Sequence, residues 1–525
     1  MQTEVAERLA ESDQASRLQD VLQLFGYTNL KPEQSTVIEA IIAGEDVLAV
    51  LPTGYGKSAC FQIPGVVTRS RTLVVSPLIA LMENQVRQLR KLGIKAFCLH
   101  SDLTEARKLA VYYYFAHLPP GEPCFLYLSP EQLLTDVFHQ RFDGVFDRLA
   151  VDEAHCVSTW GDAFRPDYQR IRVAVQRLRI RQCAAFTATV DPKIERDIRK
   201  KIPLRPGFVR VEMDPFRANL RLEVVSPALY DDPACVVGSK KLARLLRLLD
   251  RTEYIGPTIV YCSTREGSAS LWSRMRKRYA WKTLNPHGYT TYLFHAGLPY
   301  EDKDLALEGF MNDDRPIIFA TSAFGMGIDR PDVRQVIHYS APTTLIDYAQ
   351  QVGRAGRDGL SSLCTMFHLQ DDILERRAVR QRWNVPTYDF VEGVHRRMRA
   401  VLSKFPQQQR RRYNIHTFTN IMRRLVEAND RIRSKDAYLT RVKAAIGMLQ
   451  RVGVILEDGD GLAVFDIIPG SQTHLRLLEM TQMEERKLER ESDRLVRFFD
   501  SPNPNQRLLW DILRTDEYPL AVTED

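Results

Sequence analysis

Short apolar runs rich in β-branched residues alternate with amphipathic stretches from residue 47 to residue 211, and this alternation restricts the fold more than any other feature of the sequence. Continuous apolar strands separated by helices are typical of a parallel sheet that is covered on both faces. The pattern stops near residues 200–206 and starts again at residue 258. The sequence therefore predicts an α/β fold with two tandem parallel-sheet domains, joined near residues 205–235. The strands are expected at residues 47–51, 72–76, 96–99, 125–128, 149–151 and 183–186, and then at 258–262, 292–295, 317–320, 336–339 and 364–367.

The residues after 370 follow a different pattern, in which helices replace the buried strands. Residues 415–468 have the order helix, helix and hairpin that outlines a winged helix, and Asp458-Gly459-Asp460-Gly461 is a strong hairpin turn. The C-terminal helix is expected to dock on the core, with docking on a partner as the alternative. The predicted domains are a first α/β domain (1–206), a second α/β domain (207–370), a basic helical connector (371–412), a winged-helix-like domain (413–470) and a C-terminal helical tail (471–525).

The composition argues against several classes of protein. No apolar run reaches the roughly 20 residues that a membrane-spanning helix needs, and the N-terminal residues lack the apolar segment of a secretion signal. The eight cysteines are scattered singly and none follows Cys364, which argues against a disulfide framework and a cysteine-rich zinc module. Residues 371–451 contain 19 Lys and Arg against 8 Asp and Glu. This excess indicates either a polyanionic partner or a solvated helical surface.

A glycine-rich segment directly follows the first expected strand. Thr53, Gly54, Gly56, Lys57 and Ser58 form a Thr-Gly-x-Gly-Lys-Ser sequence that leads into a helical stretch. Glycines allow backbone N–H groups to surround phosphates at the N-terminus of a helix. Lys57 is expected to reach the β- and γ-phosphates of a nucleotide, and Ser58 to bind Mg²⁺.

An acidic pair follows another apolar strand. Asp152 is expected to hold Mg²⁺ through water, and Glu153 to orient or deprotonate the water that attacks the γ-phosphate. His155 lies two residues further on. It is expected to form a link to the second domain rather than to bind a metal.

Gln350, Arg354 and Arg357 lie on a glycine-punctuated segment of the second α/β domain. Two arginines at this spacing can reach across a cleft between domains. Arg357 is expected to act on the γ-phosphate as an arginine finger, with Arg354 beside it. An arginine that comes from the other domain would couple hydrolysis to closure of the cleft.

These three motifs, in this order and on two α/β domains, resemble the core of a superfamily 2 helicase. The detailed sequence of the motifs resembles the RecQ family of DNA helicases over about residues 20–370, and this resemblance implies two RecA-like domains. The resemblance also implies an adenine motif. In it Tyr27 would stack on the base, Gln34 would bond N6 and N7 of the adenine, and Lys31 stands where the family usually has Arg.

Other segments resemble motifs through which the family binds and senses DNA. The loop after His155 contains Trp160, Phe164 and Arg165, which would stack on single-stranded DNA and attract its phosphates. Asp329 would help to coordinate closure of the cleft around ATP. The other residues that the resemblance assigns to DNA binding or coupling are Ser76, Pro77, Thr187, Thr189, Ser263, Arg265, His295 and Thr321.

The C-terminal region departs from the family pattern. The four-cysteine zinc subdomain of the family has no counterpart, so ATP and Mg²⁺ are the expected cofactors and zinc is not expected. The expected wing tip is acidic and lacks the aromatic residue that often splits the duplex in the family. The basic helices would hold duplex DNA through its phosphates.

The resemblance implies an ATP-dependent DNA helicase that moves 3′-to-5′ on single-stranded DNA, unwinds tailed duplexes and acts in DNA repair and recombination. A protein partner could bind the C-terminal region, and no membrane contact is expected. The expected compartment is the cytoplasm with its nucleoid in a prokaryote, or the nucleus in a eukaryote. Three alternatives remain: a DNA-stimulated translocase or remodeller subunit that separates strands weakly, an ATP-gated nucleic-acid clamp, and an RNA helicase with the same ATP-hydrolysing core.

Overall fold

The computed structural model describes residues 14–52, 54–77, 79–100, 103–119, 121–133, 136–159, 171–188, 190, 192–213, 217–226, 237–324, 330–368, 373, 386–403, 435–458 and 461–515. These residues fall into two units. The first unit contains the described residues between 14 and 158, between 171 and 368 and between 498 and 515. The second contains Thr159 and the described residues between 373 and 497.

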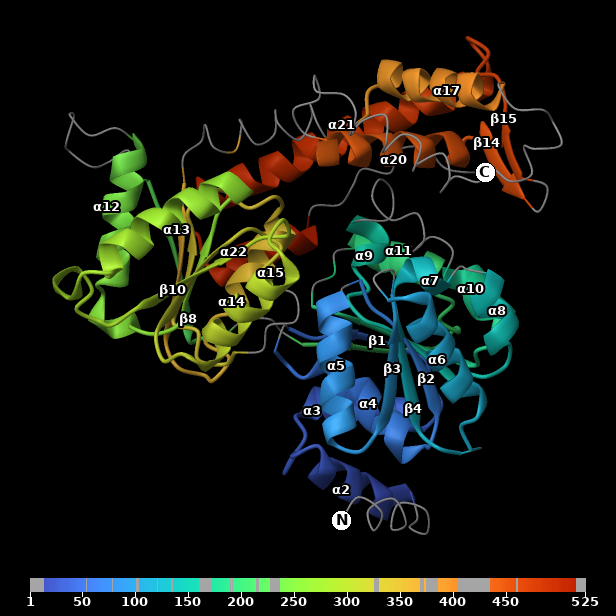
Figure 1. The fold of residues 1–525 in the computed structure, drawn as a ribbon, viewed down its shortest axis with the longest axis horizontal. Helices are drawn as coiled ribbons and strands as arrows, with labels where there is room; N and C mark the ends of the chain where they lie inside the picture. Colours follow the sequence, from blue (N-terminus) through green and yellow to red (C-terminus); the bar gives the residue numbers. More distant parts are fainter. Residues whose placement is uncertain are drawn as a thin grey trace. The chain divides into compact units, whose positions relative to one another are not determined.

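Seven parallel strands form the first sheet of the first unit, in the order β3-β4-β2-β5-β6-β1-β7 (Figure 1). The inner strands are buried along nearly their whole length, as expected for a parallel sheet packed between helices. The strands are β1 (Val47–Val50), β2 (Arg71–Val75), β3 (Lys95–Leu99), β4 (Cys124–Leu128), β5 (Arg148–Val151), β6 (Gln182–Thr187) and β7 (Val209–Glu212). The helices are α2 (Gln14–Leu24), α3 (Pro32–Ile42), α4 (Lys57–Val67), α5 (Ile79–Lys91), α6 (Glu105–Ala116), α7 (Pro130–Leu133), α8 (Asp136–Phe142), α9 (Cys156–Thr159), α10 (Ile171–Arg177) and α11 (Pro192–Lys201).

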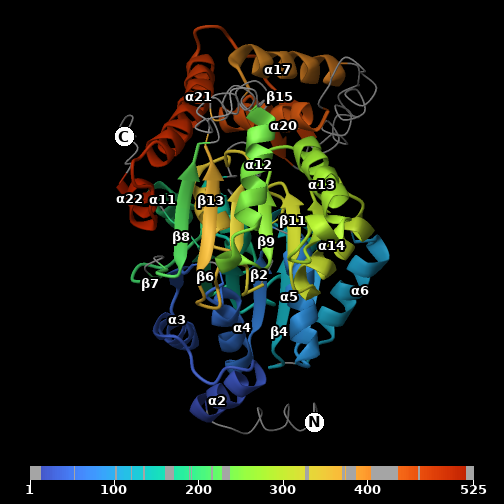
Figure 2. The ribbon, with the colours of Figure 1, turned by 90° about the vertical axis from the view of Figure 1, so that its left-hand side faces the viewer.

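Six parallel strands form the second sheet, in the order β10-β11-β9-β12-β13-β8. Figure 2 shows β8 beside β13 and β9 beside β11, with α13 and α14 next to the sheet, and β12 lies between β13 and β9. The strands are β8 (Leu220–Val225), β9 (Thr258–Tyr261), β10 (Thr290–Phe294), β11 (Pro316–Ala320), β12 (Gln335–His338) and β13 (Ser362–Phe367). The helices are α12 (Val237–Leu249), α13 (Arg265–Tyr279), α14 (Tyr300–Asn312) and α15 (Leu345–Val352), with 3-10 turns at Thr252–Tyr254 and Lys282–Leu284.

The predicted class, an α/β fold with two tandem parallel-sheet domains, is confirmed. Every strand expected from an apolar run is present, with bounds that differ by at most two residues. The edge strands β7 and β8 were not expected. Since β7 pairs with β1, the first sheet extends beyond residue 206, where the first domain was predicted to end.

The described part of the second unit has one hydrophobic core. It is shared by α17 (Tyr388–Leu402), α20 (Lys435–Arg451), the hairpin β14 (Ile455–Asp458) and β15 (Gly461–Val464), and the start of α21 (Gln472–Phe499). The expected hairpin is present, because Asp458 pairs with Gly461 and only residues 459 and 460 remain for the turn. Helix α17 comes from the segment predicted as a connector, so this core reaches further toward the N-terminus than the predicted domain 413–470. Residues 413–434, where the first helix of the winged helix is expected, lie outside the described residues.

The C-terminal tail is helical, as expected. Helix α21 ends with Phe498 and Phe499, which belong to the first unit, and α22 (Gln506–Thr515) follows. Helix α22 packs on α15 of the second sheet (Figure 1). None of the described helices combines the length and the apolar character that crossing a membrane requires.

Candidate functional site

The glycine-rich segment forms a tight loop between β1 and α4. Gly54 and Gly56 have φ angles of 80° and 81°, in the left-handed region that glycine adopts with least strain. Lys57 is the first residue of α4, and its buried Nζ donates a hydrogen bond to the Leu51 carbonyl at 3.2 Å. The first backbone N–H groups of a helix point out of its N-terminus, and here they can bind phosphates together with Lys57. Thr53 lies outside the described residues.

Ser58 is held by a partner that no sequence spacing indicated. Its hydroxyl accepts a hydrogen bond from Gln85 Nε2 at 3.0 Å, and Gln85 Oε1 in turn accepts one from Gln62 Nε2 at 2.6 Å. Gln85 lies on α5, so it meets Ser58 only through the packing of α4 and α5. These contacts orient the hydroxyl that is expected to bind Mg²⁺.

The acidic pair lies at the end of β5 and is deeply buried. Glu153 has a φ of 48°, which is unusual for a residue other than glycine, and its N–H donates to Asp152 Oδ1 at 2.9 Å. Burial, and then the Glu153 charge, raise the pKa of Asp152 to about 7. Burial alone would also raise the pKa of Glu153, but the positive charges of Lys57, Arg354 and Arg357 outweigh it and lower that pKa. Glu153 therefore remains an ionised base at neutral pH.

A divalent cation fits this donor set. The buried Asp152 carboxylate has too little positive charge beside it to stay fully ionised, as its raised pKa shows. One carboxylate and the Ser58 hydroxyl are hard oxygen ligands, of the kind that Mg²⁺ uses together with water and substrate phosphates. Ser58 and Asp152 are the residues that could hold it.

His155 connects the two sheets. Its Nε2 lies 3.1 Å from the side-chain nitrogen of Gln350 on α15. An amide nitrogen can only donate, so Nε2 accepts and the ring proton sits on Nδ1. Nδ1 faces Thr187 Oγ1 at 3.2 Å and Glu153 Oε2 at 3.4 Å. Burial lowers the pKa of His155, which favours this neutral form.

The two arginines reach the same site from the second sheet. Helix α15 ends at Val352, and Arg354 and Arg357 follow it. A Cβ built on Gly54 would lie 2.5 Å from Cδ of Arg357, so this side chain lies against the phosphate loop. Both guanidinium charges lower the pKa of Glu153. The structure thus brings Lys57 and Glu153 of one sheet together with both arginines of the other.

The expected adenine motif packs directly on the phosphate loop. The buried Gln34 donates from Nε2 to the Tyr55 carbonyl at 2.8 Å and accepts at Oε1 from the Lys31 N–H at 3.0 Å. Lys31 Nζ lies 4.1 Å from the centre of the Tyr55 ring, and the Tyr55 hydroxyl donates to the Glu33 carboxylate. A Cβ on Gly56 would lie 3.2 Å from the Tyr27 hydroxyl. The sequence did not single out Tyr55, which bridges the two motifs here.

Three of the residues expected to bind DNA lie in a row on the second sheet. Ser263, His295 and Thr321 follow the ends of β9, β10 and β11, and the last residues of these strands are aligned in register. The exposed Arg265 begins the adjacent helix α13. Carboxyl ends of parallel strands meet at one edge, so these groups share that edge.

The other residues in this group are placed differently. Ser76 and Pro77 follow β2 on the first sheet, and Ser76 is buried. Thr187 is also buried and contacts His155. The predicted residues that lie outside the described part of the chain are Trp160, Phe164, Arg165, Thr189 and Asp329, in addition to Thr53.

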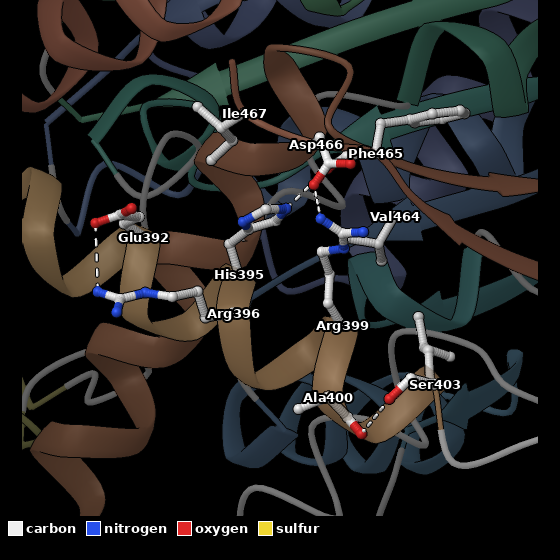
Figure 3. Close-up of a pocket in the computed structure, with 11 residues that line it drawn as sticks. Glu392, His395, Arg396, Arg399, Ala400, Ser403, Val464, Phe465, Asp466 and Ile467 are labelled. Atoms are coloured by element: carbon white, nitrogen blue, oxygen red, sulfur yellow. Dashed lines mark hydrogen bonds and ion pairs between the residues drawn. The ribbon is translucent and has the colours of Figure 1, made fainter. Parts of the chain in front are cut away.

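The second unit contains a separate cavity of about 620 Å³ between α17 and the segment after β15 (Figure 3). His395 Nε2 donates to the Phe465 carbonyl at 2.7 Å, and Arg399 pairs with Asp466 (Figure 3). Arg396 pairs with Glu392 at 3.4 Å. Each arginine of this cavity thus has an acidic partner, so the cavity offers little net charge to a ligand.

Comparison with known proteins agrees with this geometry. Residues 31–197 match the DEAD/DEAH box helicase family, and residues 240–359 match the helicase conserved C-terminal domain. The chain is 34% identical over 417 residues to the protein of Bacillus subtilis (strain 168) named "Probable ATP-dependent DNA helicase RecS", which covers 77% of this chain and 79% of that protein. It is 34% identical over 370 residues to "ATP-dependent DNA helicase Q5" of Rattus norvegicus, covering 69% of this chain and 37% of that protein.

A solved structure shares the fold. Helicase Lhr of Mycobacterium smegmatis, solved with ssDNA and AMP-PNP, gives a TM-score of 0.55 at 18% identity, over 89% of this chain and 62% of that chain. At this level of identity the likeness concerns the fold alone. Since the chain spans only 37% of the rat relative, the activity of that whole protein does not transfer directly.

Proposed function

The chain belongs to the RecQ family of superfamily 2 helicases, and from this premise we propose that it uses ATP hydrolysis to move along single-stranded DNA and to unwind duplexes. One observation carries the proposal. Three cations lie close enough to Glu153 to lower its pKa. Lys57 comes from the first sheet, as Glu153 does, and Arg354 and Arg357 come from the second. A site assembled from two sheets can sense their separation.

The first sheet would bind the nucleotide and activate water. The N-terminus of α4 and Lys57 would hold the phosphates, and Mg²⁺ held by Ser58 and Asp152 would neutralise part of their charge. Glu153 would accept a proton from the attacking water or orient it, which its lowered pKa permits at neutral pH. Tyr27 would stack on adenine, and Gln34 would recognise its edge after turning away from the Tyr55 carbonyl.

The second sheet would complete the site only when the cleft is closed. Arg357, with Arg354 beside it, would stabilise the charge that develops on the γ-phosphate. The bond between Gln350 and His155 would report closure to Glu153, because the His155 Nδ1 proton faces that carboxylate. Asp329 would assist in coordinating this closure.

DNA would bind across the carboxyl ends of the strands. Ser263, Arg265, His295 and Thr321 would hold the phosphates of one strand on the second domain, and Ser76 with Pro77 on the first. Thr187, with Thr189, would relay this contact through His155. Trp160, Phe164 and Arg165 would sense the DNA bases, and the family resemblance implies 3′-to-5′ movement.

The C-terminal region would hold duplex DNA or a protein partner, in a winged-helix-like domain that needs no zinc. One observation favours the alternative of a translocase or remodeller with weak strand separation. The expected wing tip, Asp458-Gly459-Asp460-Gly461, contains two acidic residues and no aromatic residue that could stack between the separating bases. A clamp that does not hydrolyse ATP would have no need for the charged surroundings of Glu153. A DNA substrate would require the protein to work in the nucleoid of a prokaryote or in the nucleus of a eukaryote.

The test measures ATP hydrolysis and strand separation in parallel, on DNA with a 3′ tail, with a 5′ tail and with blunt ends, and on single-stranded RNA. Opening of the 3′-tailed substrate with DNA-stimulated hydrolysis supports the helicase. Stimulated hydrolysis without opening supports the translocase, and stimulation by RNA alone supports an RNA helicase. Glu153→Gln is the control, and unchanged hydrolysis in this variant would overturn the assignment of the ATP site.

A further inference from the structure

The C-terminal segment docks beside the helix that leads into the two arginines. The rings of Phe498 and Phe499 lie with their centres 5.5 Å and 5.1 Å from that of Tyr348 on α15. Asp500 Oδ1 lies 2.6 Å from Nε2 of His368, which follows β13. Helix α22 then packs on α15 (Figure 1). The apolar Leu509, Ile512 and Leu513 of α22 are almost fully buried.

A buried glutamine in α22 binds the backbone turn that precedes β8. Gln506 is 7% exposed, and its Oε1 accepts from the Arg217 N–H at 2.9 Å. Its Nε2 donates to the Arg217 carbonyl at 2.7 Å and to the Leu220 carbonyl at 2.8 Å. Both protons of the amide nitrogen are therefore used, and the oxygen is bonded as well. The buried apolar face of α22 packs on the domain, and this amide binds the turn directly.

The same turn holds the backbone on both sides of Arg354. The Arg217 guanidinium donates from Nη2 to the Gly353 carbonyl at 2.8 Å. Asn219 Nδ2 donates to the Gly356 carbonyl at 2.7 Å. Gly353 directly precedes Arg354, and Gly356 directly precedes Arg357. A Cβ on Gly356, where φ is 58°, would lie only 2.5 Å from Asn219 Nδ2, so the fit between the turn and this segment is close.

We propose that Gln506 is a positioning residue for ATP hydrolysis, which acts by fixing the turn through which Arg217 and Asn219 hold the backbone of Arg354 and Arg357. The C-terminal helix is then part of the hydrolytic machinery, although it touches neither the nucleotide nor DNA. This inference rests on the proposed action of the two arginines at the γ-phosphate. Because a displacement of about 1 Å in a group that acts in the transition state can cost about 10²-fold in rate, a loosened turn should lower kcat by about tenfold or more.

The test compares Gln506→Met with Arg507→Ala. Methionine has nearly the volume and length of glutamine but makes none of the three hydrogen bonds, and Arg507 is an exposed neighbour on the same helix. The affinities for ADP and for ADP with aluminium fluoride, which mimics the transferring phosphoryl group, are measured for both variants. The amount of ADP bound at saturation gives the fraction of folded enzyme.

We expect Gln506→Met to bind ADP within twofold of the wild type, to bind the aluminium fluoride complex about tenfold more weakly, and to lose about tenfold in kcat at nearly unchanged KM. ADP would contact only the first domain in the proposed site, whereas a transition-state mimic would also need the arginines. A purely structural role would reduce the fraction that binds ADP, and it would leave the ratio of the two affinities unchanged. That result, or a Gln506→Met enzyme identical to Arg507→Ala, would overturn the proposal.

Two further variants separate the possible failures. Gln506→Glu keeps the bond from the Arg217 N–H and loses both donated bonds, so it should shift the ratio in the same direction if Gln506→Met does not fold. In a background that carries both Arg354→Ala and Arg357→Ala, Gln506→Met should have little further effect, since the turn acts through these two arginines. If Arg357→Ala alone leaves binding of the mimic unchanged, the proposed role of the arginines fails. If Arg357→Ala impairs it and both Gln506 variants do not, only the role of Gln506 fails.

Discussion

Replacing Gly54 by alanine tests whether Arg357 must lie against the phosphate loop during hydrolysis. A Cβ at this position would lie 2.5 Å from Cδ and 2.6 Å from Nε of Arg357. Non-bonded heavy atoms need about 3.5 Å, so the arginine would have to withdraw by about 1 Å. A shift of this size in a group that acts in the transition state predicts a fall in kcat of about 10²-fold.

The assay is phosphate release at saturating ATP and single-stranded DNA, with Gly44→Ala as the matched control. Gly44 has a φ of 84°, and a Cβ there would have no atom within 4 Å. The control therefore carries a similar backbone strain, about 1–2 kcal/mol, without the collision. It should lower Tm and keep kcat within twofold. Adding Gly54→Ala to Arg357→Ala should cost little more, and a Gly54→Ala enzyme with kcat within threefold of the wild type would refute the reasoning.

Three other changes probe separate parts of the site. Burial raises the pKa of Asp152 to about 7, so the folded protein loses stability as the pH rises through 7 and this carboxyl ionises. Without Mg²⁺ or nucleotide, Asp152→Asn should therefore have a higher Tm than the wild type at pH 8.5 and a similar Tm at pH 4.5. A difference in Tm that does not depend on pH contradicts this. Gln350→Leu removes the donor to His155 and should reduce the ratio of DNA-stimulated to basal hydrolysis at least threefold, whereas an equal loss of both rates would show that this bond does not couple the domains. Lys31→Met removes the charge over Tyr55, a contact worth about 0.5–1 kcal/mol, and should raise KM for ATP about twofold to fivefold at similar kcat; an unchanged KM would show that the contact does not support nucleotide binding.

The central strands could be predicted because they are buried on both faces and therefore consist of continuous apolar residues. The two strands that were missed lie at sheet edges and carry charges. β7 contains Arg210 and Glu212, which pair with each other at 2.8 Å, and β8 contains Arg221 and Glu223, which pair at 3.0 Å. Charged side chains protect an exposed edge from pairing with other chains. Because these strands contain charges, they form no continuous apolar run by which they could be predicted.

The site could be predicted where its chemistry lies within a few consecutive residues. The phosphate loop, the acidic pair and the arginine segment each have that form. The contacts of Gln85 with Ser58, of Tyr55 with Lys31 and of Gln506 with Arg217 do not, because each joins residues from separate elements. Gln506 and Arg217 are 289 positions apart. Only the docking of α22 on the second sheet brings them together, and no periodicity or spacing encodes that docking.

The two sides of the ATP site are fixed to different degrees, and this difference bears on how hydrolysis moves the domains. Within the second sheet, Arg217 and Asn219 donate hydrogen bonds to the backbone of the arginine segment at 2.7–2.8 Å. Gln506 in turn holds the backbone of Arg217 at 2.7–2.9 Å. Across the cleft, the described contacts include the bond of Gln350 to His155 and the side chain of Arg357 against Gly54. With Arg357 acting on the γ-phosphate as proposed, release of this phosphate would remove an attraction across the cleft and would leave the internal bonds unchanged. The arginine segment would then leave the first domain as a rigid part of the second, which is what a hinged two-domain motor requires.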